Sequence, residues 1–365
     1  PMTTQTLQDI IGKEPFHWRG DRDDLHGFAP AFVALQGDDA EPPAAAVDEF
    51  AAFLATIHFP PNPFRNFDNS LPTDLPLPGH FSVGRFSPAG TPLPNGNATL
   101  GLGQYMPPLT LAGPFACATC HTLPTGLGPD LVRQGTQFVP FPPGPNGERH
   151  HGLVSVDGST NRTIKIAQLR NMYEKVGMDL TQTEVVSGFG FLHDGSIASL
   201  ARFLSSPAFQ FIGDQSLANM IAFLLSFSGS DLPEGSASSP LFPPGTASKD
   251  THAGVGTQLT VTDLANASSA DLALIAAMQS EADLGRVGLV GKGLVSGETR
   301  GYAYLAGGTF QSDRAAETVS AGMLLGAATS AAPITLTVVP LGSETRIGVD
   351  RDVDGYLDRD ELDAG

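Results

Sequence analysis

The sequence predicts a mixed, multidomain fold: a mainly α-helical core with long irregular loops, followed by a small β-sandwich domain. The chain has 365 residues, and at roughly 150 residues per domain this length suggests two or three domains. Glycine and proline contribute 42 and 30 residues, which favours many turns and irregular segments. After residue 255 the hydrophobic pattern also changes from helical spacing to short alternating runs.

The first 235 residues carry two strong helical patterns. Apolar residues recur at three- and four-residue spacing in segments 47–58 and 216–227, which predicts amphipathic helices there. Between these segments, residues 60–114 hold 12 of the 30 prolines and predict extended, irregular structure. We divide this part of the chain into a helical remnant over 1–59, a Pro/Gly-rich connector over 60–99 and a domain over 100–235.

The C-terminal part predicts a β-rich domain over 256–365. One helix is expected over 270–279, where Ser269 is placed to cap the N-terminus. Short runs with partial alternation, bounded by Gly or Ser, predict strands over 286–294, 299–305, 318–324 and 333–339. Segment 345–349 also has a strand-like pattern. Together these short strands predict the β-sandwich.

Part of the sequence is repeated. The residues Phe16, Gly20, Leu25 and Phe28 recur with the same spacing as Phe191, Gly195, Leu200 and Phe203. Leu7 corresponds to Leu169, and Ala52-Phe53-Leu54 corresponds to Ala222-Phe223-Leu224. A duplicated unit predicts two related domains, of which the chain would contain the end of the first. The alternative is that 1–59 is a helical cap of separate origin.

The only two cysteines lie together in Cys117-Ala118-Thr119-Cys120-His121. C-x-x-C-H is the signature of c-type haem attachment, because two thiols on one turn can form thioethers while the next histidine ligates the iron. A zinc site would need a second pair of ligands, and a redox C-x-x-C would need a βαβ context. We therefore expect one covalent haem c, on a c-type cytochrome core, and a periplasmic or extracellular location.

The sixth iron ligand decides between two functions. A His/Met haem suits electron transfer, whereas an open distal side can bind peroxide. The candidates considered are Met178, Met172, Met106, Met220, His150, His151 and His193. We favour Met178, because it follows Gly177 in an inserted segment where a thioether has no evident packing role. Met172 and Met220 fall at positions that predict core packing.

A family resemblance is carried by two segments. Gln168-Leu169-Arg170-Asn171 and Gly190-Phe191-Leu192-His193-Asp194-Gly195-Ser196 resemble the bacterial di-haem cytochrome c peroxidase superfamily. The resemblance covers about residues 100–230 and implies that His193 lies near the haem without ligating iron. The chain departs from that family by an insertion that contains Met178 and by the absence of a first C-x-x-C-H. Peroxidase activity in that family uses two haems.

Arg170 is one of three basic residues that lie close together in an acidic protein. Together with Arg162 and Lys165, it is a candidate to neutralise haem propionates. The alternative is that these side chains only solubilise the surface.

The C-terminus matches a twelve-residue calcium loop. Asp350, Asp352 and Asp354 occupy positions 1, 3 and 5, and Gly355 supplies the sharp turn at position 6. The remaining ligands would be the Tyr356 carbonyl at position 7, Asp358 at position 9 and a bidentate Glu361 at position 12. Hard oxygen ligands at this density favour Ca²⁺. The alternative is a solvated acidic tail.

Charge limits the classes of partner. With 20 basic and 38 acidic side chains the net charge is −18, which excludes nucleic-acid binding by phosphate neutralisation and disfavours anionic membranes. No apolar run approaches the ~20 residues that span a bilayer. The expected partners are redox proteins such as other cytochromes, a missing N-terminal haem domain, or a second copy of the chain.

The sequence is compatible with three functions. The first is an electron-transfer c-type cytochrome, and the alternative is a haem peroxidase-like oxidoreductase with an open or displaceable sixth site. The third is a structural or adhesive module in which the calcium-braced β-domain is the functional part.

Overall fold

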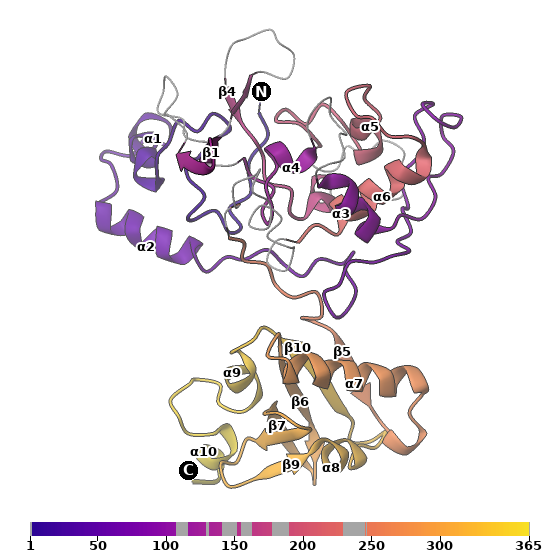
Figure 1. Cartoon of the computed structure of the whole chain (residues 1–365). Helices are drawn as coiled ribbons and strands as arrows, with labels where there is room; N and C mark the ends of the chain where they lie inside the picture. The colour runs from indigo at the N-terminus through magenta and orange to yellow at the C-terminus, as the bar shows by residue number, and fades with distance from the viewer. Residues whose placement is uncertain are drawn as a thin grey trace. The chain divides into compact units, whose positions relative to one another are not determined.

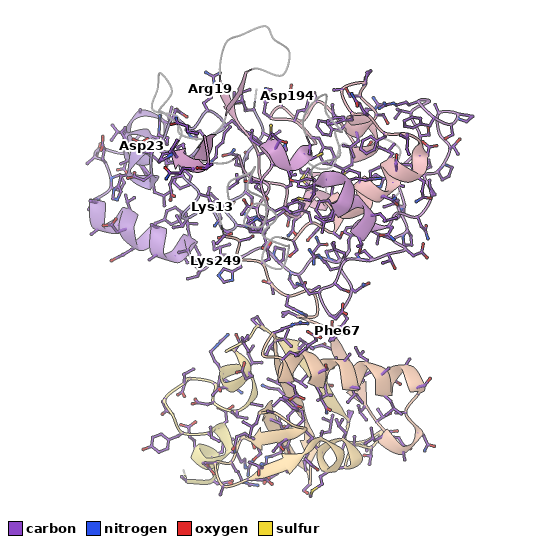
Figure 2. All side chains as sticks on the ribbon, in the orientation of Figure 1. Lys13, Arg19, Asp23, Phe67, Asp194 and Lys249 are labelled. Carbon is purple, nitrogen blue, oxygen red and sulfur yellow. The ribbon has the colours of Figure 1, made fainter. Side chains whose placement is uncertain are left out.

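A computed structural model describes residues 2–106, 116–128, 131–140, 152–154, 163–176, 190–228, 245 and 247–364. The chain forms two compact units (Figure 1). Unit 1 comprises Pro1–Phe64 and Leu71–Asp250, and unit 2 comprises Arg65–Ser70 and Thr251–Gly365. A short piece of the expected connector, which includes Phe67 (Figure 2), therefore packs with the C-terminal unit.

Unit 1 consists of short elements joined by irregular chain. Its helices are η1 (Leu25–Phe28), α1 (Ala29–Ala34), α2 (Ala44–Leu54), α3 (Ala98–Tyr105), α4 (Cys117–Cys120), η2 (Met172–Val176), α5 (Leu200–Leu204) and α6 (Asp214–Leu225). Two antiparallel pairs are formed by β1 (Leu131–Gln134) with β2 (Gln137–Pro140) and by β3 (Gly152–Val154) with β4 (Thr163–Lys165).

The prediction of a mainly α-helical core is wrong. Only 31% of the structure is helical and 17% is strand. Among the described helices of unit 1, only α2, α3 and α6 reach eight residues. The physical reason is that prolines and glycines interrupt the chain between these helices, so most of unit 1 is held by side-chain packing and loop hydrogen bonds.

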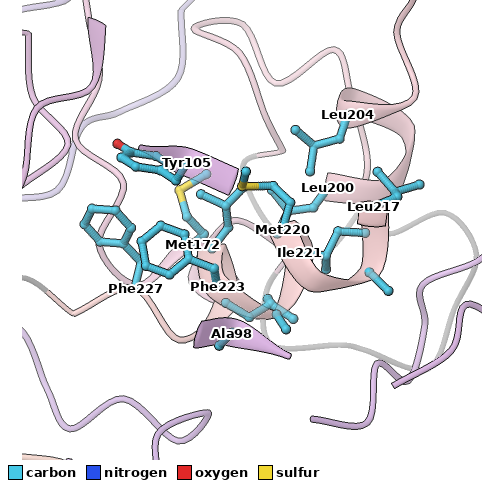
Figure 3. Close-up of a cluster of buried hydrophobic side chains, with 14 of the residues drawn as sticks. Ala98, Tyr105, Met172, Leu200, Leu204, Leu217, Met220, Ile221, Phe223 and Phe227 are labelled. Carbon is cyan, nitrogen blue, oxygen red and sulfur yellow. The ribbon is translucent and has the colours of Figure 1, made fainter. Parts of the chain in front are cut away.

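Helix α6 forms the centre of the hydrophobic cluster of unit 1. Every residue from Leu217 to Leu225 is buried, and α3 lies directly on this helix. A Cβ atom at Gly101 would lie 2.1 Å from the Asn219 carbonyl oxygen, so only glycine permits this close approach. Figure 3 shows Tyr105 beside Phe223 and Phe227, with Met172 and Met220 in the same cluster. Both methionines belong to the core, as the sequence predicted.

The sequence repeat is visible in the backbone. The Phe16 N–H donates to the Arg22 carbonyl at 2.7 Å, and the Phe191 N–H donates to the Ile197 carbonyl at 2.8 Å. The second residue of each turn has the same positive φ of 65°, and the glycines Gly20 and Gly195 have φ of 63° and 72°. The two segments therefore adopt the same local fold.

The two copies also exchange hydrogen bonds reciprocally. The Lys165 N–H donates to the Trp18 carbonyl at 2.7 Å, and the Thr3 N–H donates to the His193 carbonyl at 2.8 Å. Thr3 and Lys165 are equivalent positions in the repeat, as are Trp18 and His193. The segment that begins each copy is therefore hydrogen-bonded to the turn of the other copy.

Unit 2 contains a single six-stranded antiparallel sheet with the order β5-β10-β6-β7-β8-β9. Its strands are β5 (Gln258–Val261), β6 (Gly288–Val295), β7 (Glu298–Tyr304), β8 (Thr309–Ser312), β9 (Thr318–Ser320) and β10 (Ile334–Val339). Its helices are η3 (Leu264–Asn266), α7 (Ser269–Asp283), α8 (Ala321–Gly326), α9 (Glu344–Gly348) and α10 (Asp358–Ala364).

The β-sandwich prediction is wrong because helices take the place of a second sheet. Ile275 and Met278 of α7 and Leu324 and Leu325 of α8 share a hydrophobic cluster with Phe310 and other sheet residues. The strand expected over 318–324 ends at Ser320 and continues as α8, and the strand expected over 345–349 is the helix α9. The strands β5 and β8 were not predicted. Within the described residues no helix is both long and apolar enough to cross a bilayer.

Candidate functional site

The C-x-x-C-H segment forms one closed helical turn. Helix α4 spans the two cysteines, and the His121 N–H donates to the Cys117 carbonyl at 2.9 Å. At the start of the turn the Ala116 N–H donates to Thr119 Oγ1 at 3.2 Å, which satisfies a backbone donor at the helix N-terminus. Both cysteines are free thiols and are partly exposed.

The imidazole of His121 is held in one orientation by two backbone carbonyls. Its Nδ1 lies 2.8 Å from the Gly126 oxygen and 3.0 Å from the Ala167 oxygen. Because both partners are acceptors, Nδ1 carries the proton and Nε2 keeps its lone pair. Nε2 has no hydrogen-bond partner among the described residues. Burial lowers the pKa of His121 and favours this neutral, ligand-competent form.

The two acceptors are fixed by a tight loop and the segment that crosses it. The Gly126 N–H donates to the Thr122 carbonyl at 2.7 Å, and the Leu169 N–H donates to the Thr125 carbonyl at 3.1 Å. Gly126 has φ of 74°, and a Cβ there would lie 2.8 Å from the Leu169 Cβ. A side chain at this position would therefore separate the loop that contains Gly126 from the segment that contains Ala167, and both carbonyls that bind His121 would move.

Tyr105 of α3 adds a third contact that the sequence did not reveal. Its hydroxyl donates a short hydrogen bond to the His121 carbonyl. The ring is fully buried between Phe223 and Phe227, at centroid distances of 5.1 and 6.0 Å. Burial raises the pKa of Tyr105, so the hydroxyl stays protonated as a donor. No motif marks this tyrosine, because its contact with the histidine arises only from helix packing.

The chemistry of the thiols disfavours the redox and zinc alternatives. Burial raises the pKa of Cys117 to about 12 and also raises that of Cys120, whereas a redox-active cysteine needs a stabilised thiolate. Within the described residues, the only three acidic, His or Cys side chains that converge on a shared point belong to the C-terminal loop. Cys117, Cys120 and His121 do not converge as zinc ligands would.

Arg170 is buried and satisfied by other side chains of unit 1. Its guanidinium forms an ion pair with Asp9 at 2.5 Å and donates to Ser248 Oγ at 2.6 Å. It also lies over the ring of Phe59, 4.1 Å from the centroid. Arg170 therefore anchors a segment whose Ala167 carbonyl accepts a hydrogen bond from His121 Nδ1. Lys165 donates to the carbonyls of Lys13 and Pro15, and Arg162 lies outside the described residues.

His193, in the second copy of the repeat, has a buried ring nitrogen without a described hydrogen-bond partner. It lies in the turn that follows Phe191, and its Nδ1 is buried without a hydrogen-bond partner among the described residues. Met178, His150 and His151 lie outside the described residues. Met106 ends α3 and packs against the hydrophobic core of unit 1.

A cavity of about 250 Å³ lies where the two copies of the repeat meet. It is lined by equivalent stretches of both copies, residues 4–13 and 165–175, together with Trp18. Leu127 and Ala167 also line it, so the cavity borders the backbone that holds His121. Cys117, Cys120 and His121 themselves do not line this cavity.

The C-terminal loop gathers its carboxylates at one point. Ligand atoms of Asp350, Asp352 and Asp354 all lie within 4.8 Å of one another. The Asp350 carboxylate accepts the N–H groups of Val353 at 2.8 Å and Gly355 at 3.2 Å, and Gly355 has φ of 94°. Burial and the neighbouring aspartates raise the pKa of Glu361. A bound cation would relieve the repulsion among these neighbouring carboxylates.

The loop is flanked by helices. It runs from the end of α9 into α10, which provides Asp358 and Glu361. Asp358 accepts the Arg351 N–H at 2.8 Å, and Asp354 accepts the Tyr356 N–H at 2.8 Å. Of the six predicted ligands, the structure brings Asp350, Asp352 and Asp354 together. Tyr356, Asp358 and Glu361 follow them on the same segment between α9 and α10.

Comparisons of the chain with protein-family models, curated proteins and solved structures found no match. Function is therefore inferred from the site itself.

Proposed function

We propose that the protein is an electron-transfer c-type cytochrome that carries one haem on Cys117 and Cys120, in the periplasm or outside the cell. The observation that supports this most strongly is the state of His121. Its Nδ1 proton is shared by two carbonyls, so Nε2 is oriented and unprotonated as an iron ligand must be.

The donor set fits a haem. Two neutral thiols lie on one turn beside an imidazole whose free nitrogen is basic, and thioether formation would consume both thiols. When bound, the haem would supply one-electron redox chemistry. The carbonyls of Gly126 and Ala167 would keep the Nδ1 proton in place during electron transfer, so no proton needs to leave His121. Tyr105 and Arg170 would hold the backbone that presents these groups.

Met178 is the proposed sixth ligand, and it determines the function of the site. A thioether on the distal side closes the iron to peroxide, whereas an open distal side would allow peroxidase-like activity. The acidic protein, with net charge −18, favours basic redox partners by electrostatic steering.

An optical spectrum tests this proposal. The full chain is exported to the periplasm of a host that matures c-type cytochromes, and the oxidised haem protein is recorded with and without peroxide. We expect a low-spin spectrum with a weak band at about 695 nm, typical of His/Met iron. Met178→Ala should abolish the band, and Met323→Ala, at an exposed position of α8, should retain it. A high-spin spectrum with peroxide turnover in the wild type would overturn the electron-transfer assignment.

We also propose that the C-terminal loop binds Ca²⁺ as a structural brace of unit 2. The convergence of Asp350, Asp352 and Asp354 supports this, together with the sharp turn at Gly355. Helix α10 is also tied to the rest of unit 2 by Asp363, which pairs with Arg314 at 2.8 Å. A bound cation would therefore hold the loop between α9 and α10 together, while the ion pair of Asp363 with Arg314 ties α10 to the rest of unit 2.

A further inference from the structure

Helix α2 presents an apolar face that nothing in the described part of the chain covers. Phe50 is 48% exposed and Phe53 is 59% exposed, and their rings stack with centroids 6.4 Å apart. The helix buries only Val47 and Leu54. Isolated surface apolar residues are common, but two stacked phenylalanines on one helix face indicate a binding surface.

The second copy of the repeat shows how the equivalent face, on helix α6, is packed. Alignment of Ala52-Phe53-Leu54 with Ala222-Phe223-Leu224 makes Phe50 equivalent to Met220 and Glu49 equivalent to Asn219. Phe223 and Met220 are fully buried, and Asn219 is 5% exposed. The equivalent positions thus have opposite burial, and the difference is that α3 lies on α6.

The contacts of α3 define what fits such a face. At the start of α3, the Asn97 N–H donates to Asn219 Oδ1 at 2.9 Å. In the middle, a Cβ at Gly101 would lie 2.7 Å from the Phe223 Cβ, so a glycine is required. At the end, Tyr105 packs edge-on against Phe223 with centroids 5.1 Å apart. A helix with an unpaired backbone N–H at its start, a glycine at its centre and an aromatic residue one turn later meets all three requirements.

Charge on α2 supports the same orientation of an incoming helix. Glu49 stands where Asn219 accepts the N–H at the start of α3, and a carboxylate accepts such an N–H and favours the positive end of the helix dipole. Glu49 is exposed, and the neighbouring Asp48 is paired with His26 at 2.9 Å. A second copy of the chain or an anionic bilayer would bring like charge to this acidic face.

We propose that α2 is the docking surface for a helix of a separate partner protein. The helix begins at Glu49, places a glycine against Phe53 and packs an aromatic residue one turn later edge-on against the same ring. The inference depends on the repeat and on the burial of its two copies, so it holds whether or not haem is attached.

The probe for this surface is a capped, fluorescently labelled peptide with the sequence of residues 95–106, Asn-Gly-Asn-Ala-Thr-Leu-Gly-Leu-Gly-Gln-Tyr-Met. Fluorescence anisotropy is measured against the full chain. We expect saturable binding that Phe53→Asp and Glu49→Lys each weaken by at least about tenfold, the scale of one lost anchor of ~1.4 kcal/mol. A peptide in which leucine replaces the residue corresponding to Gly101 should bind the wild-type chain as weakly as the unchanged peptide binds the Phe53→Asp variant.

Leu35→Asp is the matched control, because Leu35 is an exposed apolar residue outside α2, 84% exposed. It should leave the affinity unchanged, and circular dichroism should show that all three variants keep the wild-type melting temperature. Absence of binding at millimolar peptide, or equal binding by wild type and Phe53→Asp, would overturn the proposal. Sedimentation that shows a dimer dependent on Phe53 would assign the face to a second copy and overturn it as well.

Discussion

At the scale of single residues, the orientation of His121 depends on backbone atoms. The motif itself could be recognised in the sequence because two cysteines and a histidine at fixed spacing have few other uses. The carbonyls of Gly126 and Ala167 and the hydroxyl of Tyr105 could not, since a carbonyl is common to all residues and Tyr105 reaches the site by helix packing. The sequence therefore predicted the candidate ligand but not what holds it.

Replacing Tyr105 with phenylalanine should destabilise unit 1. The substitution removes the hydrogen bond to the His121 carbonyl and leaves a partly buried acceptor without this partner, which costs about 1–3 kcal/mol. Urea unfolding of the haem-free chain measures the effect. Tyr356→Phe is the control, because Tyr356 is 69% exposed and should change stability by less than about 0.5 kcal/mol. Equal stability of the two variants would show that the Tyr105 contact does not support the site.

At the scale of elements, two helices with similar sequence patterns have different environments. Hydrophobic periodicity predicted both α2 and α6, because each carries apolar residues at helical spacing. It did not predict that α6 is buried all round while α2 buries only two residues. That difference depends on whether a neighbouring helix such as α3 is present, and periodicity within one helix does not contain this information.

The same substitution in the two helices should therefore have unequal effects. Phe223→Ala removes a fully buried ring beside Tyr105 and should cost about 3–5 kcal/mol. Phe53→Ala removes an exposed ring and should cost less than about 1 kcal/mol. Thermal or denaturant unfolding of the full chain measures both. Similar losses in the two variants would contradict the different burial of the two helices.

At the scale of the whole molecule, the chain divides into two units, and the architecture of each unit was predicted incorrectly. The helical content of unit 1 was overestimated, since strong patterns in 47–58 and 216–227 were extended to segments that prolines and glycines keep irregular. In unit 2 the alternating runs predicted strands, but nothing in them specified that α7 and α8 would cover the sheet. Layer composition depends on contacts between segments far apart in sequence.

Calcium should stabilise unit 2 alone. At a free concentration 100 times the dissociation constant, a ligand that binds only the folded state adds about 2.7 kcal/mol. In calorimetry, replacing calcium with a chelator should lower the melting temperature of one of the unfolding transitions. Asp350→Asn should remove this response. Asp38→Asn, an exposed carboxylate of unit 1, is the control that should keep it. A melting profile unaffected by chelation would contradict the calcium brace.

The central claim is that Cys117, Cys120 and His121 attach and ligate a haem, and the intact mass of the exported chain tests it most directly. Produced in a host that matures c-type cytochromes, the wild type should gain the mass of one haem, and neither thiol should react with an alkylating agent after denaturation. Cys117→Ala combined with Cys120→Ala should abolish the added mass. A wild-type chain that is recovered without haem, with two thiols that alkylate, would contradict the account.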